Sequence, residues 1–537
     1  MRLLRALRPL AALLVCGALA VSCTEARSAD SAKSGGPAGV AGVAALSAHE
    51  RIVPAPASTA PGGPGYTLGP GTAVRATAGS AGAKRVAELL AEAWRPVTGL
   101  PLPVSGSDAG TGRDGLRLRL DGNAGAFGEE GYRLEVDEDG AVLTAHRPAG
   151  LFRGAQTLRQ LLPPARGPWT LAGGTVTDTP RFGYRGAMLD VARHFFTVEQ
   201  VKKYVDQLAL YKINTLHLHL TDDQGWRIAV ASRPRLASYG GASEVGGGPG
   251  GHWTQEQYRD LVAYAGERYI EVVPEIDVPG HTNAALASYA ELNCNGIAPA
   301  RYTGVKVGFS SLCVPKEETY AFVDDVLREI AALTPGRYLH IGGDEAHSTS
   351  RTDYRAFMDR VQPMVADRGK TVLAWHQLTG AQPAPGAVVQ YWGHDRTTAA
   401  EKAAVADAAR AGTKVVLSPA DRIYLDMKYD RGTVIGTAWA GYVPVRRAYE
   451  WDPGAYLPGV PEESVLGVEA PLWTETVTNG RELEQLAFPR VIGAAELGWS
   501  KAAALDWDAY RLRLAAQGPR LDALGVRYFR APDVPWE

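Results

Sequence analysis

Eight short apolar runs alternate with amphipathic helical stretches from Tyr184 onward, and this alternation restricts the fold more than any other feature of the chain. The runs are GAMLDV (186–191), TLHLHL (215–220), IEVVPEI (270–276), YLHIGG (338–343), TVLAWH (371–376), AVVQYW (387–392), KVVLSP (414–419) and SVLGVEA (464–470). Helical patterns occupy 197–210, 254–268, 317–333, 354–368 and 398–411. Strands that alternate with helices in this way predict a (β/α)8 TIM barrel with long loops after its strands. A doubly wound sheet is the alternative that fits the same alternation.

The chain divides into four segments by composition. Residues 1–23 form an export signal, and residues 24–65, rich in Ala, Gly, Ser and Pro, read as a disordered tether. Residues 66–176 contain strand-like pieces at 116–120, 132–136 and 141–145 and helical pieces around 82–95 and 152–162. This pattern predicts a small α+β domain that precedes the barrel, which spans 177–537.

The first 23 residues combine a positive start, with Arg2, Arg5 and Arg8, with an apolar stretch at 10–21 that is short for a membrane span. The stretch ends in AVSC, which resembles a bacterial lipobox with Cys23 as the lipid acceptor. Ala20 stands where Leu is more usual, so both lipidation and ordinary cleavage stay open. Either outcome predicts an exported protein, extracellular or anchored by lipid at the outer face of the cell membrane.

Two cysteines, Cys294 and Cys313, follow the signal region, nineteen positions apart. In an exported protein, such a pair favours a disulfide over two free buried thiols.

The charge balance argues against a polyanionic partner. The formal net charge is −2, and no basic run follows the N-terminus. The sequence therefore predicts no nucleic-acid partner, and contact with a membrane only through the lipid anchor.

Carboxylates and aromatic residues follow most of the predicted strands. Because the carboxyl ends of barrel strands carry the active site, we expect these side chains to converge on one face. They are Asp190, Arg193, Asp222, Asp223, Asp277, His281, Asp344, Glu345, Trp375, Trp392, Tyr424, Asp426, Trp473 and Glu475.

The adjacent acids Asp344 and Glu345 follow a glycine pair at the end of an apolar run. Like-charged neighbours and apolar surroundings raise the pKa of one carboxyl, so that one acid keeps a proton while the other stays ionised. This is the requirement of glycosidic bond cleavage. A solvated turn with no chemistry is the plain alternative.

A metal site is the third reading, because His217 and His219 stand at i and i+2 on one predicted strand. The pair lies before the strand end, and only His281 accompanies the carboxylates. A buried, hydrogen-bonded histidine pair is therefore favoured, with no metal and no cofactor.

Five motifs resemble bacterial β-N-acetylhexosaminidases of glycoside hydrolase family 20. They are RGAMLDVARHFF (185–196), LHLHLTDDQGWR (216–227), VPEIDVPGHTNAAL (273–286), HIGGDEAH (340–347) and EAPLWTET (469–476). The resemblance covers about residues 66–537. It implies an exo-acting, retaining enzyme on oligosaccharides that end in N-acetylglucosamine or N-acetylgalactosamine, such as chitin fragments or glycans. In this family the substrate's 2-acetamido group is the nucleophile, and an oxazolinium intermediate forms.

The resemblance also implies roles for individual residues. Glu345 is the general acid and then the base, Asp344 orients the acetamido N–H, and Tyr424 bonds its carbonyl oxygen. The implied sugar-enclosing walls are Trp375, Trp392, Trp439 and Trp473. Hydroxyl binding falls to Arg193, Asp426 and Glu475, and Asp222 and His281 tune the acid.

Three other readings stay open at this stage. A non-catalytic sugar-binding protein needs the tryptophans but not both Asp344 and Glu345. A metal-dependent hydrolase or deacetylase predicts sensitivity to chelators, and a disaccharide-releasing enzyme differs only in its loops.

Overall fold

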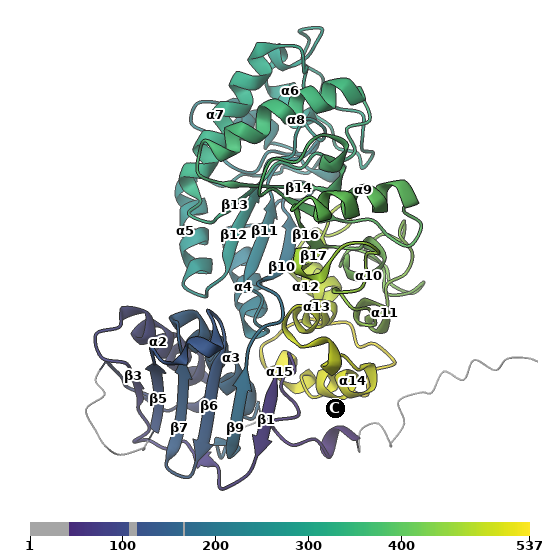
Figure 1. Ribbon diagram of the computed structural model, residues 1–537. Helices are drawn as coiled ribbons and strands as arrows, with labels where there is room; N and C mark the ends of the chain where they lie inside the picture. Colours follow the sequence, from purple (N-terminus) through teal and green to yellow (C-terminus); the bar gives the residue numbers. More distant parts are fainter. Residues whose placement is uncertain (1–41, 107–114, 165–166, 537) are drawn as a thin grey trace, which may run out of the picture. The chain divides into compact units, whose positions relative to one another are not determined.

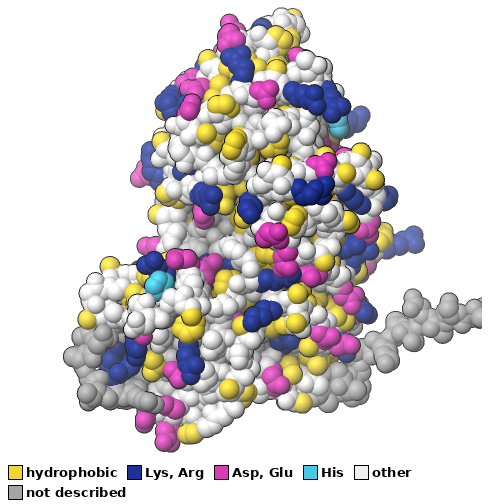
Figure 2. Space-filling view, in the orientation of Figure 1, with side chains coloured by type: hydrophobic (Ala, Val, Ile, Leu, Met, Phe, Trp, Pro, Cys, Tyr) yellow, Lys and Arg dark blue, Asp and Glu magenta, His cyan; other side chains and the backbone are white. Residues whose placement is uncertain are grey.

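The computed structural model describes residues 42–106, 115–164 and 167–536 (Figure 1). The predicted signal segment 1–23, with Cys23, lies outside these residues. No helix in the described part of the chain is long and apolar enough to cross a membrane. On the face drawn in Figure 2, Lys and Arg side chains are interspersed with Asp and Glu.

A seven-stranded mixed sheet precedes the barrel, with the order β1-β9-β6-β7-β5-β3-β4. Its strands are β1 (Ser58–Pro61), β3 (Val74–Ala76), β4 (Val104–Ser105), β5 (Gly115–Leu120), β6 (Tyr132–Asp137), β7 (Gly140–Ala145) and β9 (Gly174–Asp178). Helices α2 (Ala81–Thr98) and α3 (Pro148–Leu161) pack on each other and on these strands, and β2 (Tyr66–Thr67) pairs with β8 (Thr170–Leu171). This arrangement is the predicted α+β domain.

The predicted tether of residues 24–65 is wrong for its C-terminal part. Strand β1 pairs antiparallel with β9, and Ile52 and Val53 are fully buried. The side chain of Gln160 accepts from the Val53 backbone N–H at 2.9 Å and donates to its carbonyl at 2.6 Å. An edge strand needs only backbone pairing with a partner far along the chain, which the small and proline-rich composition did not reveal.

Strands β10 to β17 form a closed parallel barrel in chain order, which decides against a doubly wound sheet. They are β10 (Tyr184–Asp190), β11 (Thr215–His219), β12 (Glu271–Glu275), β13 (Tyr338–His340), β14 (Thr371–Trp375), β15 (Val388–Tyr391), β16 (Lys414–Leu417) and β17 (Val465–Leu472). The closing pair is β10 with β17, in which Tyr184 is opposite Gly467. The predicted TIM barrel is thus confirmed. Six of the eight predicted runs contain their strands, and the runs at 186–191 and 464–470 overlap β10 and β17.

Helices lie between the strands on the outside of the barrel (Figure 1). They are α4 (Val198–Leu210), α5 (Gln255–Gly266), α7 (Glu317–Leu333), α8 (Arg351–Ala366) and α9 (Ala399–Arg410). Helices α4, α5 and α9 begin with the same local device, a capping box in which the Thr side chain caps the helix and a Gln or Glu three residues later returns a hydrogen bond. Local sequence therefore determines where these helices begin.

Short helices occupy the loops and the C-terminal part. Helix α6 (Asn283–Ser288) follows β12, and α10 (Ala420–Ile423) and α11 (Val445–Tyr449) lie between β16 and β17. The chain ends with α12 (Gly480–Ala487), α13 (Arg490–Trp499), α14 (Trp507–Ala515) and α15 (Gly518–Ala523). The long insertion between β16 and β17 supplies Tyr424 and Asp426.

The predicted disulfide between Cys294 and Cys313 is present. It closes the loop between α6 and α7. Within this loop, a Cβ on Gly308 would lie 3.2 Å from the backbone oxygen of Glu345. The crosslinked loop therefore packs beside one of the two adjacent acids.

Replacing both Cys294 and Cys313 by Ser is expected to lower the free energy of unfolding by about 3 kcal/mol, because a loop of this length regains its chain entropy in the unfolded state. Denaturant unfolding of the oxidised wild type and the double variant measures the difference. The reduced wild type is the control and should unfold like the double variant. Equal free energies of unfolding for the oxidised wild type, the reduced wild type and the variant would contradict the estimate.

Candidate active site

The turn after β13 positions the adjacent acids. Gly342 and Gly343 have φ values of 62° and 94°, and a Cβ on Gly342 would lie 1.7 Å from the Asp277 carboxylate. The Gly343 N–H donates to that carboxylate at 3.0 Å. Glu345 itself has a φ of 43°, which costs a non-glycine residue energy and is typical of functional sites. The glycine pair is thus required by the close approach of Asp277, and it turns Asp344 and Glu345 out of the strand direction.

Asp344 and Glu345 have different surroundings. The Asp344 side chain is 10% exposed, whereas the Glu345 side chain is 28% exposed. Burial raises the pKa of Asp344 to about 6, an effect that the neighbouring Glu345 increases and that His281 opposes. The Oδ1 atom of Asp344 has no hydrogen-bond partner among the described residues. One acid is therefore enclosed with a free acceptor, and the other faces solvent.

A cavity of about 460 Å³ lies beside Glu345. Gln377 and Trp392 also line it, and the Trp392 indole N–H donates to Gln377 at 3.0 Å. The cavity gives Glu345 room for a leaving group or for water.

A chain of charged side chains connects Glu345 with the barrel interior. His281 Nε2 lies 3.4 Å from Glu345 Oε2, and His281 Nδ1 lies 3.2 Å from Asp222 Oδ1. The other oxygen of Asp222 contacts an Arg193 nitrogen at 2.9 Å and His219 Nε2 at 2.7 Å. Asp222 is thus shared by three cationic groups.

The charges in this chain stabilise one another. Burial opposes ionisation of Asp222, but Arg193 and His281 hold its pKa well below the ordinary value. In return, Asp222 and Asp277 raise the pKa of His281 well above its ordinary value against the effect of burial. Asp222 is therefore a carboxylate and His281 an imidazolium at neutral pH.

Five aromatic rings form a contiguous cluster at the strand ends. The Trp473 ring lies 5.8 Å from Trp375 and 6.4 Å from Tyr424, and Trp439 lies 5.9 Å from Trp392 and 6.0 Å from Tyr424. Trp375 is fully buried, whereas Trp439 is 45% exposed. Burial, with Asp344 and Asp426 nearby, raises the pKa of Tyr424 well above 10, so its hydroxyl remains a donor.

Polar atoms without partners border this aromatic cluster. Within the described chain, Arg193 Nε and Asp426 Oδ1 lack hydrogen-bond partners, while the other oxygen of Asp426 accepts from Thr437 at 3.0 Å. Burial and the nearby Glu475 raise the pKa of Asp426 to about 8. The Arg193 guanidinium lies 4.8 Å from the Trp473 ring. Buried groups that lack protein partners beside aromatic faces are suited to sugar hydroxyls.

The residues predicted for the site thus come together around one group of strand ends. The predicted buried histidine pair is also present, since His217 and His219 are fully buried and each contacts carboxylates. Two contributors had no assigned role in the sequence analysis. Asp277 approaches the glycine turn, and Glu275 contacts both histidines. The sequence showed that Glu275 and Asp277 flank the end of a predicted strand. It could not show their roles, because the residues that they contact are distant along the chain.

Two protein families match almost all of the chain that the structure describes. Residues 182–502 match "Glycosyl hydrolase family 20, catalytic domain", and residues 49–179 match "Glycosyl hydrolase family 20, domain 2".

Individual proteins agree with these matches. A β-N-acetylhexosaminidase of Cellulomonas fimi is 44% identical over 395 residues, which cover 73% of this chain and 79% of that protein. The solved GH20 β-N-acetylhexosaminidase of Streptomyces coelicolor A3(2) is 61% identical, with a TM-score of 0.89, and covers 91% of this chain and 99% of its own. A mutant β-hexosaminidase of Streptomyces plicatus, solved in complex with product (GlcNAc), is 60% identical with a TM-score of 0.89 and covers 91% and 98%.

Proposed function

Since the chain belongs to glycosyl hydrolase family 20, we propose that it removes single N-acetylhexosamine residues from the non-reducing ends of oligosaccharides by substrate-assisted, retaining catalysis. The chain is a glycoside hydrolase with the β-N-acetylhexosaminidase activity of this family. The exo action, the mechanism and the residue roles are the proposal. One observation carries it: the enclosed Asp344 has a free acceptor oxygen next to a solvent-facing Glu345.

The first chemical step breaks the glycosidic bond. The acetamido carbonyl oxygen of the substrate attacks the anomeric carbon as Glu345 gives a proton to the leaving oxygen. Asp344 accepts a hydrogen bond from the acetamido N–H and stabilises the positive charge of the oxazolinium as it forms. The Tyr424 hydroxyl, which stays protonated, donates to the carbonyl oxygen and holds it on the line of attack.

The second step returns the enzyme to its starting state. Glu345, now a carboxylate, takes a proton from water as the water oxygen attacks the anomeric carbon. The carbon–oxygen bond of the five-membered ring breaks, and the acetamido group reforms. Two inversions at the anomeric carbon give net retention.

The aromatic cluster and the partnerless polar atoms support an exo mode. Trp375 and Trp473 would enclose the acetamido group, which turns a flexible internal nucleophile into a positioned one and contributes a large effective molarity. Arg193, Asp426 and Glu475 would bond the hydroxyls of a terminal sugar. A sugar bonded on all of these hydroxyls has no free position for a further residue on its non-reducing side.

The central test compares 4-nitrophenyl N-acetyl-β-glucosaminide with the matching β-glucoside, each with and without EDTA. We expect fast, chelator-insensitive release from the acetamido sugar alone. Equal rates on both sugars would remove the internal nucleophile, and loss of activity in EDTA would favour a metal-dependent hydrolase. Chromatography of a chitin oligosaccharide digest then separates monosaccharide release from disaccharide release.

The enzyme is expected to lose kcat/KM as the pH falls through about 6. Asp344 must be ionised to stabilise the positive charge of the oxazolinium, and burial raises its pKa to about 6, so the active form is present above this pH and disappears below it. A pH profile of kcat/KM for the glucosaminide measures the acidic limb. A profile that stays flat down to the ordinary aspartate range would show that the protonation of Asp344 does not control this limb.

We also propose that the protein is exported, on the strength of its signal-like start and the Cys294–Cys313 disulfide. Mass spectrometry of the mature protein from the native cells decides between a lipidated Cys23 and a cleaved, soluble form. An uncleaved cytoplasmic protein would contradict the proposal.

A further inference from the structure

We propose that Glu275 is a positioning residue, a buried carboxylate that fixes the Trp375 wall and the His219–Asp222 pair from the barrel interior. This inference rests on the proposed function, because it concerns the same site. Glu275 ends β12 and is fully buried, and the proposed chemical steps do not use it.

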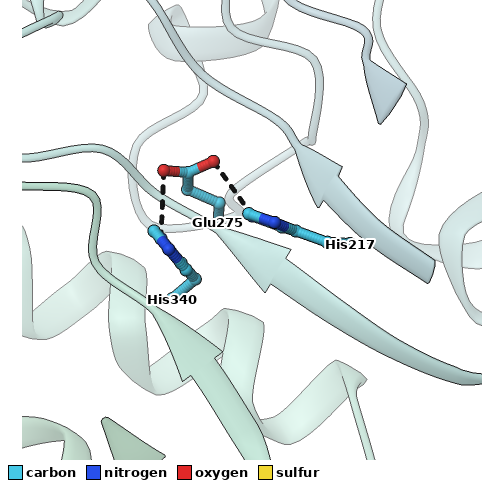
Figure 3. A group of neighbouring side chains, drawn as sticks. All are labelled: His217, Glu275 and His340. Carbon is cyan, nitrogen blue, oxygen red and sulfur yellow. Dashed lines mark ion pairs between the residues drawn. The ribbon is translucent and has the colours of Figure 1, made fainter. Parts of the chain in front are cut away.

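Two histidines contact Glu275 from the neighbouring strands (Figure 3). His217 on β11 places Nε2 3.0 Å from Oε2, and His340 on β13 places Nδ1 3.0 Å from Oε1. Burial opposes the ionisation of Glu275, but these imidazoles and that of His219 hold its pKa well below the ordinary value. The residue is therefore an anion in a fully enclosed place.

The same three side chains, His217, Glu275 and His340, are ligand types of a zinc site. At zinc–ligand distances near 2.1 Å and tetrahedral angles, the ligand atoms would lie about 3.4 Å apart. The nitrogen–oxygen separations are 3.0 Å, as in direct contacts between the side chains. The positioning role rests on these direct contacts of the Glu275 carboxylate.

Two further contacts of Glu275 lead toward the substrate. The Trp375 indole N–H donates to Oε1 at 2.8 Å, which fixes the orientation of the wall proposed to enclose the acetamido group. His219 Nδ1 lies 2.5 Å from Oε2, while its Nε2 contacts Asp222 at 2.7 Å. Since both nitrogens of His219 face carboxylates, the ring is doubly protonated and donates in both directions.

The branch through His219 continues to the reacting groups. Asp222 holds both Arg193 and His281, and His281 reaches Glu345. The position of the general acid thus depends on a path of hydrogen bonds and ion pairs that begins at Glu275 and ends in the 3.4 Å contact between His281 and Glu345.

The turn of residues 342–345, which presents Asp344 and Glu345, is coupled to the Glu275 carboxylate. The Gly342 N–H donates to His340 Nδ1 at 3.0 Å, and the same ring nitrogen lies against Glu275 Oε1, also at 3.0 Å. Glu275 is thereby connected with the wall, the acid and the turn that presents Asp344. A displacement of about 1 Å at a reacting group reduces the rate by about 100-fold.

Glu275→Gln tests this arrangement with almost no change in volume. A glutamine has one acceptor oxygen where the carboxylate has two, so its NH2 group must face either Trp375 or His219, which are both donors. One branch is therefore broken in either orientation. We expect kcat/KM for 4-nitrophenyl N-acetyl-β-glucosaminide to fall roughly 100-fold, mostly in kcat, because the loss is one of positioning.

Glu496→Gln is the matched control. Glu496 is also fully buried and its carboxylate also accepts several hydrogen bonds, from Tyr449 at 2.9 Å and from Arg513. It lies on α13 and contacts none of the site residues in the described structure. We expect this variant to lose thermal stability and to keep the wild-type kcat and KM.

A second pair of variants tests the same contact if Glu275→Gln does not fold. His340→Asn keeps an amide near the Nδ1 position, and His340→Leu offers no polar group. We expect roughly a 10-fold loss of kcat in His340→Leu and a value within about twofold of wild type in His340→Asn. Loss of the ring contact with Trp375 is common to both, so the difference isolates the polar contacts of the Nδ1 position, with Glu275 and with the Gly342 N–H.

The outcomes separate this inference from the proposed function. A wild type that does not prefer the acetamido sugar refutes the proposed function, whatever Glu275 does. An active wild type with an equally active Glu275→Gln overturns the positioning role. The positioning role is also overturned if Glu275→Gln and Glu496→Gln lose activity in the same proportion to their loss of thermal stability. Equal losses of kcat in the two His340 variants overturn it as well.

Discussion

Replacing Glu345 by Gln is expected to lower kcat/KM on a chitin oligosaccharide by about 10³-fold, within the range of 10²–10⁴ for a general acid. The amide cannot give a proton to the leaving sugar oxygen, which departs poorly as an alkoxide. Folding should be unaffected, because the Glu345 side chain is 28% exposed and, within the described residues, its ion pair is the 3.4 Å contact with His281.

Substrates with different leaving groups show whether Glu345 acts as a general acid or only binds the substrate. 4-Nitrophenolate departs without help, so kcat/KM for the 4-nitrophenyl glycoside should fall much less than that for the oligosaccharide. Steady-state kinetics on both substrates, with thermal unfolding as a check of the fold, measure the difference. Equal losses on the two substrates would assign Glu345 to binding and not to proton transfer.

Asp344→Asn is expected to lower kcat by roughly 10²–10³-fold with little change in KM, the magnitude typical of a group that stabilises charge only in the transition state. Asparagine still offers an oxygen to the acetamido N–H, but it cannot stabilise the positive charge of the oxazolinium. Asp359→Asn, an exposed substitution of the same kind on α8, should leave the kinetics unchanged.

The stability of Asp344→Asn distinguishes function from folding. Burial raises the folded-state pKa of Asp344 to about 6, so the ionised form destabilises the folded protein at neutral pH relative to acidic pH. Removing this charge should therefore leave the melting temperature unchanged or raise it. Near-wild-type turnover of the variant would refute substrate assistance, and a large fall in melting temperature would point to a structural role.

Local patterns in the sequence predicted the elements of the barrel well. The run at 215–220 contains β11, and the helical pattern at 317–333 coincides with α7 (Glu317–Leu333). Such runs are readable because period and capping are properties of a few neighbouring residues. The predicted tether failed for the opposite reason, since β1 is a strand only through its pairing with β9, more than a hundred residues away.

The sequence by itself determined the barrel, the strand-end acids and aromatic residues, and the family, because each is encoded in contiguous residues. It also placed Asp344 and Glu345 side by side. Only the tertiary structure decided which acid is enclosed, since burial and the approach of Asp277 to Gly342 depend on separate strands. It alone also brought His217, His340 and Trp375 to Glu275, because closing the barrel joins side chains from strands that are far apart along the chain.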